Sequence, residues 1–349
     1  MRISSVAAIL AVFIAMLGGS ALAEPVRGAG STFAFPLITQ WSQSYQVERA
    51  GGEDFVLQDS GVDYEPVGSL GGILRLAQPE IDFAATDAPL PPEELAKFNY
   101  VQFPIVMGGI VPVLNIEGVK TGELKLTAAV LADIYLGKIQ NWNDAAIKAS
   151  NADLTLPDLR ITVVHRSDGS GTTFNWTSFL SAASADWKTK YGADTLISWP
   201  LGVNAEGSSG MAAKVRETPG AIGYLEYGQT IRAALNYAAV QNPAGNFVKP
   251  EPAAFQAAAS TADLANAKDF YASLVNTAGA DAYPITAVTF AVMRAVPPST
   301  SRLNQTLWFF GYGLERGGAD ATALGYVPLP EALVSQVKKY WTDKFKFSS

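Results

Sequence analysis

The stretch Ile161–Ser181 (ITVVHRSDGSGTTFNWTSFLS) places a strand-like run, a loop of small polar residues and a helix-like run in close succession. Ile161–His165 is rich in β-branched residues, which favour strands. Thr172–Ser181 is expected to form a helix that starts directly after the glycines. A strand that passes through such a turn into a helix is typical of α/β proteins. This stretch therefore predicts an α/β fold.

The same alternation continues along the rest of the chain. The other expected strands are Phe55–Gln58, Ile81–Ala85, Ile110–Asn115, Gly220–Tyr224 and Ala287–Val292. The other expected helices are Leu37–Gln46, Leu70–Ala77, Leu131–Leu136 and Met211–Arg216. Alternation of this kind predicts a largely parallel sheet covered by helices. Gln241–Pro252 (QNPAGNFVKPEP) is rich in Pro, Gly and Asn and is expected to be a surface loop.

Composition excludes several classes of protein. The 349 residues are 48% hydrophobic and 16% charged, which indicates a globular chain of two domains or one large domain. The net charge of −7 argues against a protein that binds nucleic acid or an anionic membrane. Because the chain has no cysteine and one histidine, thiol catalysis, disulfides and most N/S-ligated metal sites are excluded. We expect neither a metal nor a cofactor.

Residues 1–23 are typical of a cleaved signal peptide. Arg2 provides the positive start, Val6–Leu17 is an unbroken apolar run, and Ala21–Ala23 is an A-x-A cleavage signal. The apolar run is shorter than the roughly 20 residues that a membrane-spanning helix needs. Nothing later in the chain has that length and hydrophobicity either. We therefore expect the mature protein to be secreted to the periplasm.

Three clusters of Gly, Ser and Thr each stand just before an expected helix. They are Gly28–Phe33 (GAGSTF), Gly68–Gly72 (GSLGG) and His165–Thr173 (HRSDGSGTT). The first N–H groups of a helix have no intrahelical partner and form the positive end of its dipole, so they favour an anion. Each cluster alone is also compatible with ordinary capping. Together, with Arg166 in the third, they indicate an oxyanion site; a fourth cluster, Gly207–Gly210 (GSSG), is assigned no contact.

Two further side chains have more than one interpretation. Asp87 follows the strand Ile81–Ala85, and ligands bind at the carboxyl ends of strands in α/β folds. Three interpretations of Asp87 are open: it contacts the ligand, it caps a helix, or it pairs with Arg166. His165 is expected to be structural, because a catalytic base needs a nucleophile and an orienting acid nearby. The sequence has no P-loop, dinucleotide-binding or G-x-S-x-G motif.

These segments resemble, in order and spacing, the periplasmic phosphate-binding proteins of bacterial phosphate ABC transporters, the PstS family. The matching segments are GAGSTF (28–33), GSLGG (68–72), DFAATDAPL (82–90), QFP (102–104), DIYLGKIQNW (133–142), RSDGSGT (166–172), PGAIGYLEY (219–227) and YPIT (283–286).

The resemblance implies a two-lobed periplasmic binding protein fold, type II-like, in which each lobe is a mixed β-sheet flanked by helices. It implies two hinge crossovers, near Val106 and Ala282, with lobe I formed by 24–106 and 283–349 and lobe II by 107–282. The implied function is high-affinity binding of inorganic phosphate between the lobes and its delivery to the membrane permease subunits of an ABC importer. The protein is then not an enzyme.

The resemblance also implies a set of contact residues. Asp87 is the single acidic contact, Arg166 is the cationic contact, and Asp168 pairs with that arginine. The phosphate-binding residues carried over from the family are Thr32, Phe33, Ser69, Asp87, Arg166, Ser170, Gly171 and Thr172. Two features depart from the family: Ser31 stands where alanine is common and is expected to be harmless, and 63–66 (DYEP) reads as an insertion that leaves the approach of the second cluster less certain.

The physical argument for Asp87 is one of selectivity. A carboxylate accepts a hydrogen bond only from a protonated ligand oxygen, and phosphate keeps a proton near neutral pH whereas sulfate does not. Three alternatives stay open. These are a periplasmic phosphatase or phosphoryl-transfer protein, a binding protein for sulfate, molybdate or a phosphonate, and a surface protein that only keeps the fold. Ester turnover, competition between anions and failure to bind any oxyanion separate them.

Overall fold

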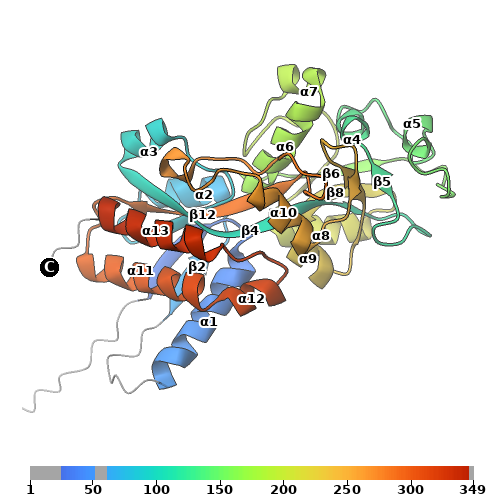
Figure 1. Cartoon of the computed structure of the whole chain (residues 1–349). Helices are drawn as coiled ribbons and strands as arrows, with labels where there is room; N and C mark the ends of the chain where they lie inside the picture. The colour runs from blue at the N-terminus through green and yellow to red at the C-terminus, as the bar shows by residue number, and fades with distance from the viewer. Residues whose placement is uncertain (1–24, 52–60, 346–349) are drawn as a thin grey trace, which may run out of the picture.

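The computed structural model describes residues 25–51 and 61–345 (Figure 1). The signal peptide expected at 1–23 and the strand expected at Phe55–Gln58 lie outside these residues. The strands are β1 Val26–Gly30, β2 Val62–Glu65, β3 Phe83–Thr86, β4 Tyr100–Leu114, β5 Lys125–Leu126, β6 Thr162–Arg166, β7 Val203–Ala205, β8 Ala221–Glu226, β9 Asn236–Tyr237, β10 Ala239–Gln241, β11 Phe247–Val248 and β12 Thr286–Arg294. The helices are α1 Phe35–Gly51, α2 Ser69–Arg75, α3 Pro92–Phe98, α4 Ala128–Tyr135, α5 Ala145–Lys148, α6 Gly171–Ala183, α7 Ala185–Lys190, α8 Gly207–Glu217, α9 Tyr227–Arg232, α10 Pro252–Ser260, α11 Thr300–Glu315, α12 Gly318–Ala323, α13 Glu331–Lys344 and the 3-10 turn Lys268–Phe270.

One mixed sheet runs through both lobes in the order β2-β1-β3-β12-β4-β8-β6-β7, and β9 also pairs with β4. Strand β1 is parallel to β2 and β3, and β6 is parallel to β7 and β8. The centre is antiparallel, because β4 and β12 run against each other and against their other neighbours. The α/β alternation is confirmed, but the expectation of a largely parallel sheet is wrong at the centre.

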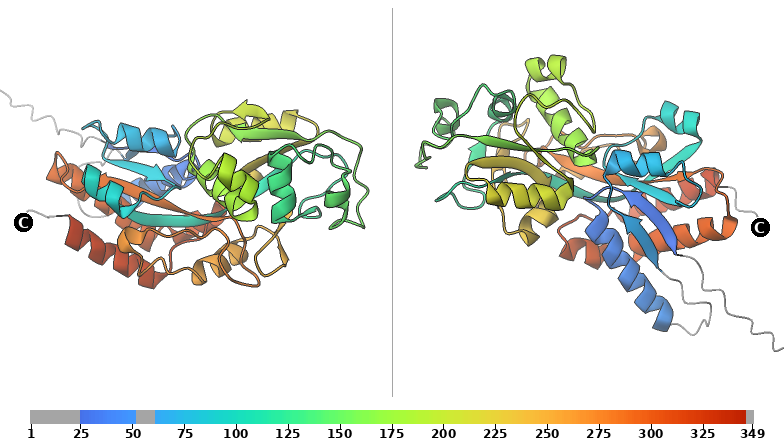
Figure 2. Two further views of the ribbon diagram at one scale, coloured as in Figure 1. Left: turned by 90° about the horizontal axis from the view of Figure 1, so that it is seen from above. Right: turned by 180° about the vertical axis from the view of Figure 1, so that it is seen from behind.

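Strand β4 joins the two lobes. Its first part, Tyr100–Gly109, pairs with β12, and its last part, Ile110–Leu114, pairs with β8. The expected strand Ile110–Asn115 is only the end of this longer element. Figure 1 shows β4 and β12 crossing between the lobe that contains α1, α11 and α13 and the lobe that contains α4, α6 and α7, and the views in Figure 2 agree. The fold is the two-lobed architecture that the sequence predicted.

Aromatic side chains fill the core of each lobe. In α1, Ile38, Trp41 and Tyr45 recur at helical spacing and are all buried, as the sequence pattern indicates. The Trp41 indole also donates to the Gly317 carbonyl at 2.9 Å, so its one polar group is satisfied. Burial of these side chains fixes α1, and with it the turn at the end of β1 that leads into the helix.

The expected loop at Gln241–Pro252 is partly wrong. Strand β11 lies within it and pairs antiparallel with β10, which ends at Gln241, and α10 begins at Pro252. The side-chain amide of Asn242 closes the segment by donating to the carbonyls of Gly279, Ala280 and Ala282. Along the described part of the chain, no helix has the length and apolar character that crossing a bilayer requires.

Candidate functional site

The helix starts named from the sequence meet where the two lobes touch. Ser69 is the first residue of α2, and its hydroxyl oxygen accepts hydrogen bonds from the Gly171 N–H at 3.0 Å and the Asp87 N–H at 3.2 Å. Leu70 N–H donates to the Gly169 carbonyl at 3.0 Å across the same contact. Because both acceptor positions of the Ser69 hydroxyl are used, its own O–H is left to donate to an anion.

Glycine is required at the third cluster. Any Cβ on Gly171 would lie 2.7 Å from the Asp87 amide nitrogen and 2.7 Å from the Asp87 Cβ. The side chain of Ser170 caps α6 by accepting from the Thr173 N–H at 3.3 Å, and Thr172 is buried in the first turn. The N-terminus of α6 therefore approaches the end of β3 at backbone distance.

Arg166 and Asp168 form a fixed, bidentate pair at the end of β6. The Arg166 Nε donates to Asp168 Oδ1 at 2.6 Å, and its Nη2 donates to Asp168 Oδ2. The Gly207 N–H, at the start of α8, donates to Asp168 Oδ1 at 3.0 Å. Desolvation opposes the charge of the buried Arg166, but the hydrogen bonds that Arg166 donates to Asp168 and the attraction of that carboxylate leave the pKa of Arg166 raised, and the pKa of Asp168 is lowered in turn. A guanidinium has five N–H donors, and this pair uses two of them.

Asp87 is a carboxylate held among hydroxyl groups. Its side chain is 2% exposed, its Oδ2 accepts from the Ser31 hydroxyl at 2.7 Å and its Oδ1 from the Thr289 hydroxyl at 2.6 Å. Burial raises the pKa of Asp87 to about 6, although both hydroxyl groups and Arg166 oppose the shift. Its backbone carbonyl accepts from the Asn175 amide at 2.7 Å. The Asp87 carboxylate is therefore stabilised by hydrogen bonds from hydroxyl groups and not by a direct ion pair.

The first cluster reaches the fourth across the interface. The Thr32 and Ser208 hydroxyl oxygens are 2.9 Å apart. The Phe33 carbonyl accepts from the Tyr326 hydroxyl at 2.5 Å, and its ring packs against that tyrosine. Helix α8 begins at Gly207 rather than at Met211, so the GSSG cluster lies in its first turn. The sequence assigned this cluster no contact with the ligand, and in the structure it contacts two residues of the candidate site, Thr32 and Asp168.

The structure brings the predicted residues of both lobes together. Ser69 links the backbones of Asp87 and Gly171, and Thr32 and Asp168 meet through the first turn of α8. Sequence reasoning missed four positions that support the site, which are Ser31, Ser208, Thr289 and Tyr326.

Two expectations about neighbouring residues are corrected or clarified. Ser31 is more than harmless, because its hydroxyl bonds Asp87 directly. The insertion-like segment 63–66 lies mostly in β2, where the Tyr64 hydroxyl donates to the Ser31 carbonyl at 3.0 Å and so contacts the first cluster. The single histidine has a packing role. The ring of His165 stacks on the Trp199 ring with centroids 4.9 Å apart, and burial lowers the pKa of His165. This packing is the structural role that the sequence indicated.

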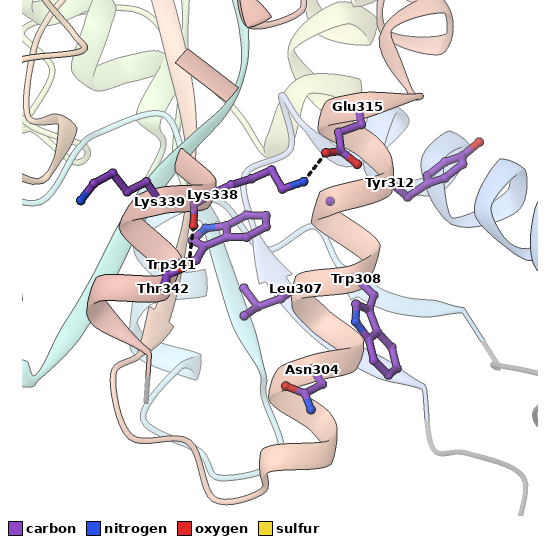
Figure 3. Close-up of a pocket in the computed structure, with 10 residues that line it drawn as sticks. Asn304, Leu307, Trp308, Tyr312, Glu315, Lys338, Lys339, Trp341 and Thr342 are labelled. Atoms are coloured by element: carbon purple, nitrogen blue, oxygen red, sulfur yellow. Dashed lines mark hydrogen bonds and ion pairs between the residues drawn. The ribbon is translucent and has the colours of Figure 1, made fainter. Parts of the chain in front are cut away.

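Two further observations separate the candidate site from a metal site and from an apolar groove. No group of three or more His, Asp or Glu side chains within residues 25–51 and 61–345 could hold a metal ion. A groove of about 530 Å³ between α11 and α13 is lined by apolar and long polar side chains, including Trp308, Trp341 and Lys338, and Figure 3 shows them. None of the predicted site residues lines it.

The geometry therefore brings backbone N–H groups, hydroxyl groups and the Arg166 guanidinium, which is paired with Asp168, close to the buried Asp87 carboxylate. Donors of this kind suit a small oxyanion, and helix N-termini favour its negative charge. A family model described as the PBP superfamily domain matches residues 18–305. A protein named phosphate-binding protein PstS from Xylella fastidiosa is 44% identical over 321 residues, which cover 92% of this chain and 86% of that protein. The chain belongs to the PstS family.

Other PstS relatives agree across nearly the full length. The protein of the same name from Pasteurella multocida is 38% identical over 98% of this chain and 97% of its own. Among solved structures, a putative phosphate ABC transporter substrate-binding protein with bound phosphate from Clostridium perfringens has a TM-score of 0.62 at 18% identity, covering 88% of this chain and all of that one. A phosphate-binding protein from Stenotrophomonas maltophilia has a TM-score of 0.67 at 20% identity, covering 91% and 94%. These structures support the two-lobed fold.

Proposed function

We propose that the protein binds inorganic phosphate between its lobes and delivers it to an inner-membrane ABC importer. The observation that carries this proposal is the buried Asp87 carboxylate, which stands among donors and close to the N-terminus of α6. A site made of donors alone accepts any tetrahedral oxyanion. One acceptor in that site favours an anion that still carries a proton, which describes phosphate near neutral pH and excludes sulfate.

Each proposed contact has a chemical role. Thr32 and Ser69 donate through hydroxyl groups, Phe33 and Thr172 through backbone amides, and Arg166 through its remaining guanidinium donors, while the Gly171 N–H holds the Ser69 hydroxyl in place. Asp168 orients Arg166 and keeps the guanidinium fixed before the anion arrives. The full proposed contact set is Thr32, Phe33, Ser69, Asp87, Arg166, Ser170, Gly171 and Thr172.

The same proposal covers compartment and partner. We infer that residues 1–23 direct export, that the mature protein is periplasmic, and that it docks on membrane permease subunits of a phosphate importer. The names of the Xylella fastidiosa and Pasteurella multocida relatives support a binding protein rather than an enzyme. The stacking of His165 on Trp199 also leaves the one imidazole of the sequence in a packing role.

We also infer that the lobes are 24–106 with 283–349, and 107–282, and that they close on the ligand. The antiparallel β4 and β12 that connect the lobes support this division, because bending at two neighbouring strands gives a hinge. Contacts such as Thr32 with Ser208 form across the interface and would be lost on opening.

The test compares binding of phosphate with hydrolysis of a phosphate ester. The mature protein is unfolded, freed of bound anions by dialysis and refolded, and then phosphate binding is measured by equilibrium dialysis. One phosphate per chain and no hydrolysis of a chromogenic phosphate ester are expected. Ester turnover that disappears in Arg166→Ala would favour the phosphatase alternative, and absence of phosphate binding would contradict the proposal.

A further inference from the structure

Glu226 is a second buried carboxyl group near the anion site, and the proposed contact set does not use it. It is the last residue of β8 and lies opposite Ile110 of β4 in the sheet register. Its side chain is 1% exposed. Neither carboxyl oxygen makes a hydrogen bond of ordinary length with any of the described residues. A carboxylate in this position pays a desolvation cost with little direct compensation.

The groups that face Glu226 come from several elements. They are Arg166 at the end of β6, which is paired with Asp168, Ser208 in the first turn of α8, Arg232 in α9, and Tyr326 after α12. The facing part of β4, Ile110–Leu114, and helix α6 contain no ionisable side chain. Three of the four facing groups belong to the site or support it, and they are Arg166, Ser208 and Tyr326. Glu226 therefore lies behind the positive charge that an anion would contact.

Burial and the site charges act on Glu226 in opposite directions. Desolvation raises the pKa of Glu226 to about 7, while the backbone N–H of Glu226 itself, then Arg166, the Ser208 hydroxyl and Arg232, lower it. An anion bound against Arg166 offsets the positive charge that stabilises the ionised carboxylate. The pKa of Glu226 must then rise further, because desolvation is left with weaker opposition.

We propose that Glu226 takes up one proton from solvent when phosphate binds, so that phosphate affinity falls as the pH rises through the neutral range. This inference rests on the proposed phosphate-binding function. Glu226 is a positioning residue that acts through Arg166 and Ser208, whereas Asp87 accepts directly from the ligand. The step is a simple protonation: a buried Glu226 oxygen gains a proton that buffer loses, and no other bond changes.

The sign follows from linkage. Below pH 6 Glu226 is already protonated in the free protein, and phosphate binding moves no proton onto it. Above pH 7 Glu226 is ionised in the free protein and protonated in the complex, so binding consumes a proton. The Kd for phosphate then rises by up to tenfold for each increase of one in pH. Phosphate itself and Asp87 also titrate, and a variant is needed to separate their contributions.

The experiment is calorimetric titration of the refolded mature protein with phosphate at pH 6, 7 and 8, in pairs of buffers with different ionisation enthalpies. The test variant is Glu226→Gln, which keeps the shape and removes the proton. The control is Glu217→Gln, which removes an exposed acid at the far end of α8. The wild type should take up about half a proton more than Glu226→Gln at pH 7 and about one more at pH 8.

The ratio of the wild-type Kd to the Glu226→Gln Kd should rise about tenfold between pH 6 and pH 8, while Glu217→Gln follows the wild type. Equal Kd values for wild type and Glu226→Gln at all three pH values would overturn the inference, because Glu226 would then be protonated throughout. A ratio of Kd values that differs from one but does not change with pH would also overturn it, because the carboxylate would then keep its charge in the complex.

The inference stays testable if Glu226→Gln does not fold. Infrared difference spectra of the wild type with ¹³C-labelled glutamate, with phosphate minus without, should show gain of a protonated glutamic acid band at pH 8. No such band would refute proton uptake by Glu226. Absence of phosphate binding by the wild type would overturn the proposed function as well, whereas binding without the band overturns this inference alone.

Discussion

Replacing Asp87 by Asn should stabilise the phosphate-free protein while relaxing its selectivity. The pKa of Asp87 is raised to about 6, about two above that of an exposed aspartate. A difference of one in pKa between the folded and the unfolded chain corresponds to about 1.4 kcal/mol. The buried carboxylate therefore lowers the free energy of unfolding by about 3 kcal/mol at pH 7 to 8. Asn keeps the shape of the protonated side chain and removes this cost.

The sign of the pH dependence is specific to a carboxyl group whose pKa is raised on folding. Its full contribution to stability is present below about pH 4, where folded and unfolded chains are both protonated, and is lost as the pH rises through 6. The stability advantage of Asp87→Asn over wild type should therefore be about half as large at pH 5 as at pH 8. Asp63→Asn, at an exposed acid of β2, is the matched control.

The assay is urea unfolding of the three phosphate-free proteins at pH 5, 6, 7 and 8, followed by anion titration at pH 7. Phosphate affinity of Asp87→Asn should change modestly, and sulfate binding should become measurable, because an amide can donate to an unprotonated anion. All titrations need one ionic strength, since screening alters anion affinity. A stability advantage of Asp87→Asn that does not grow with pH would refute the desolvation argument. Failure of Asp87→Asn to bind sulfate would refute the acceptor argument.

Three further outcomes are expected. Arg166→Ala should weaken phosphate binding by about 2–5 kcal/mol in calorimetry, and Arg166→Lys should recover only part, because the bidentate contact with Asp168 is lost; equal binding by both would place Arg166 outside the site. Ser31→Ala should weaken phosphate binding by about 1 kcal/mol, because Asp87 loses one of its two hydroxyl donors, whereas unchanged affinity would return Ser31 to the harmless role first expected. Phosphate should lower the radius of gyration of the refolded protein in X-ray scattering, and a constant radius would contradict lobe closure.

Local patterns predicted the helices α1, α2, α4, α6 and α8 and all or part of the strands β3, β4, β6, β8 and β12, because the causes of these elements are local. Ile38, Trp41 and Tyr45 mark the buried face of α1 by spacing alone. The length of β4 was missed because Pro104 and the pair Gly108–Gly109 argue against a long strand. The structure accommodates Pro104 beside an irregular step in the register between Thr289 and Phe290 of β12, which no local pattern indicates.

The site was predictable only in part. Gly/Ser/Thr clusters before helices pointed to the positions of Ser69 and Gly171, because capping and anion binding use the same N–H groups. Thr289 reaches Asp87 from 202 residues away in the middle of β12, and a buried strand threonine carries no sequence signal of that contact. Ser208 did have such a signal, a GSSG cluster before an expected helix, and it went unused because the family resemblance supplied no role for it.

The central claim, that one buried acceptor makes a donor-rich site select phosphate, is tested most directly by anion titration of the wild type. The mature protein is refolded free of anions and titrated calorimetrically with phosphate and, separately, with sulfate, at one pH and ionic strength. Phosphate should bind at one per chain, and sulfate should give no measurable heat and no competition. Sulfate binding within tenfold of phosphate would contradict the account, since donors and helix N-termini would then be acting without the carboxylate.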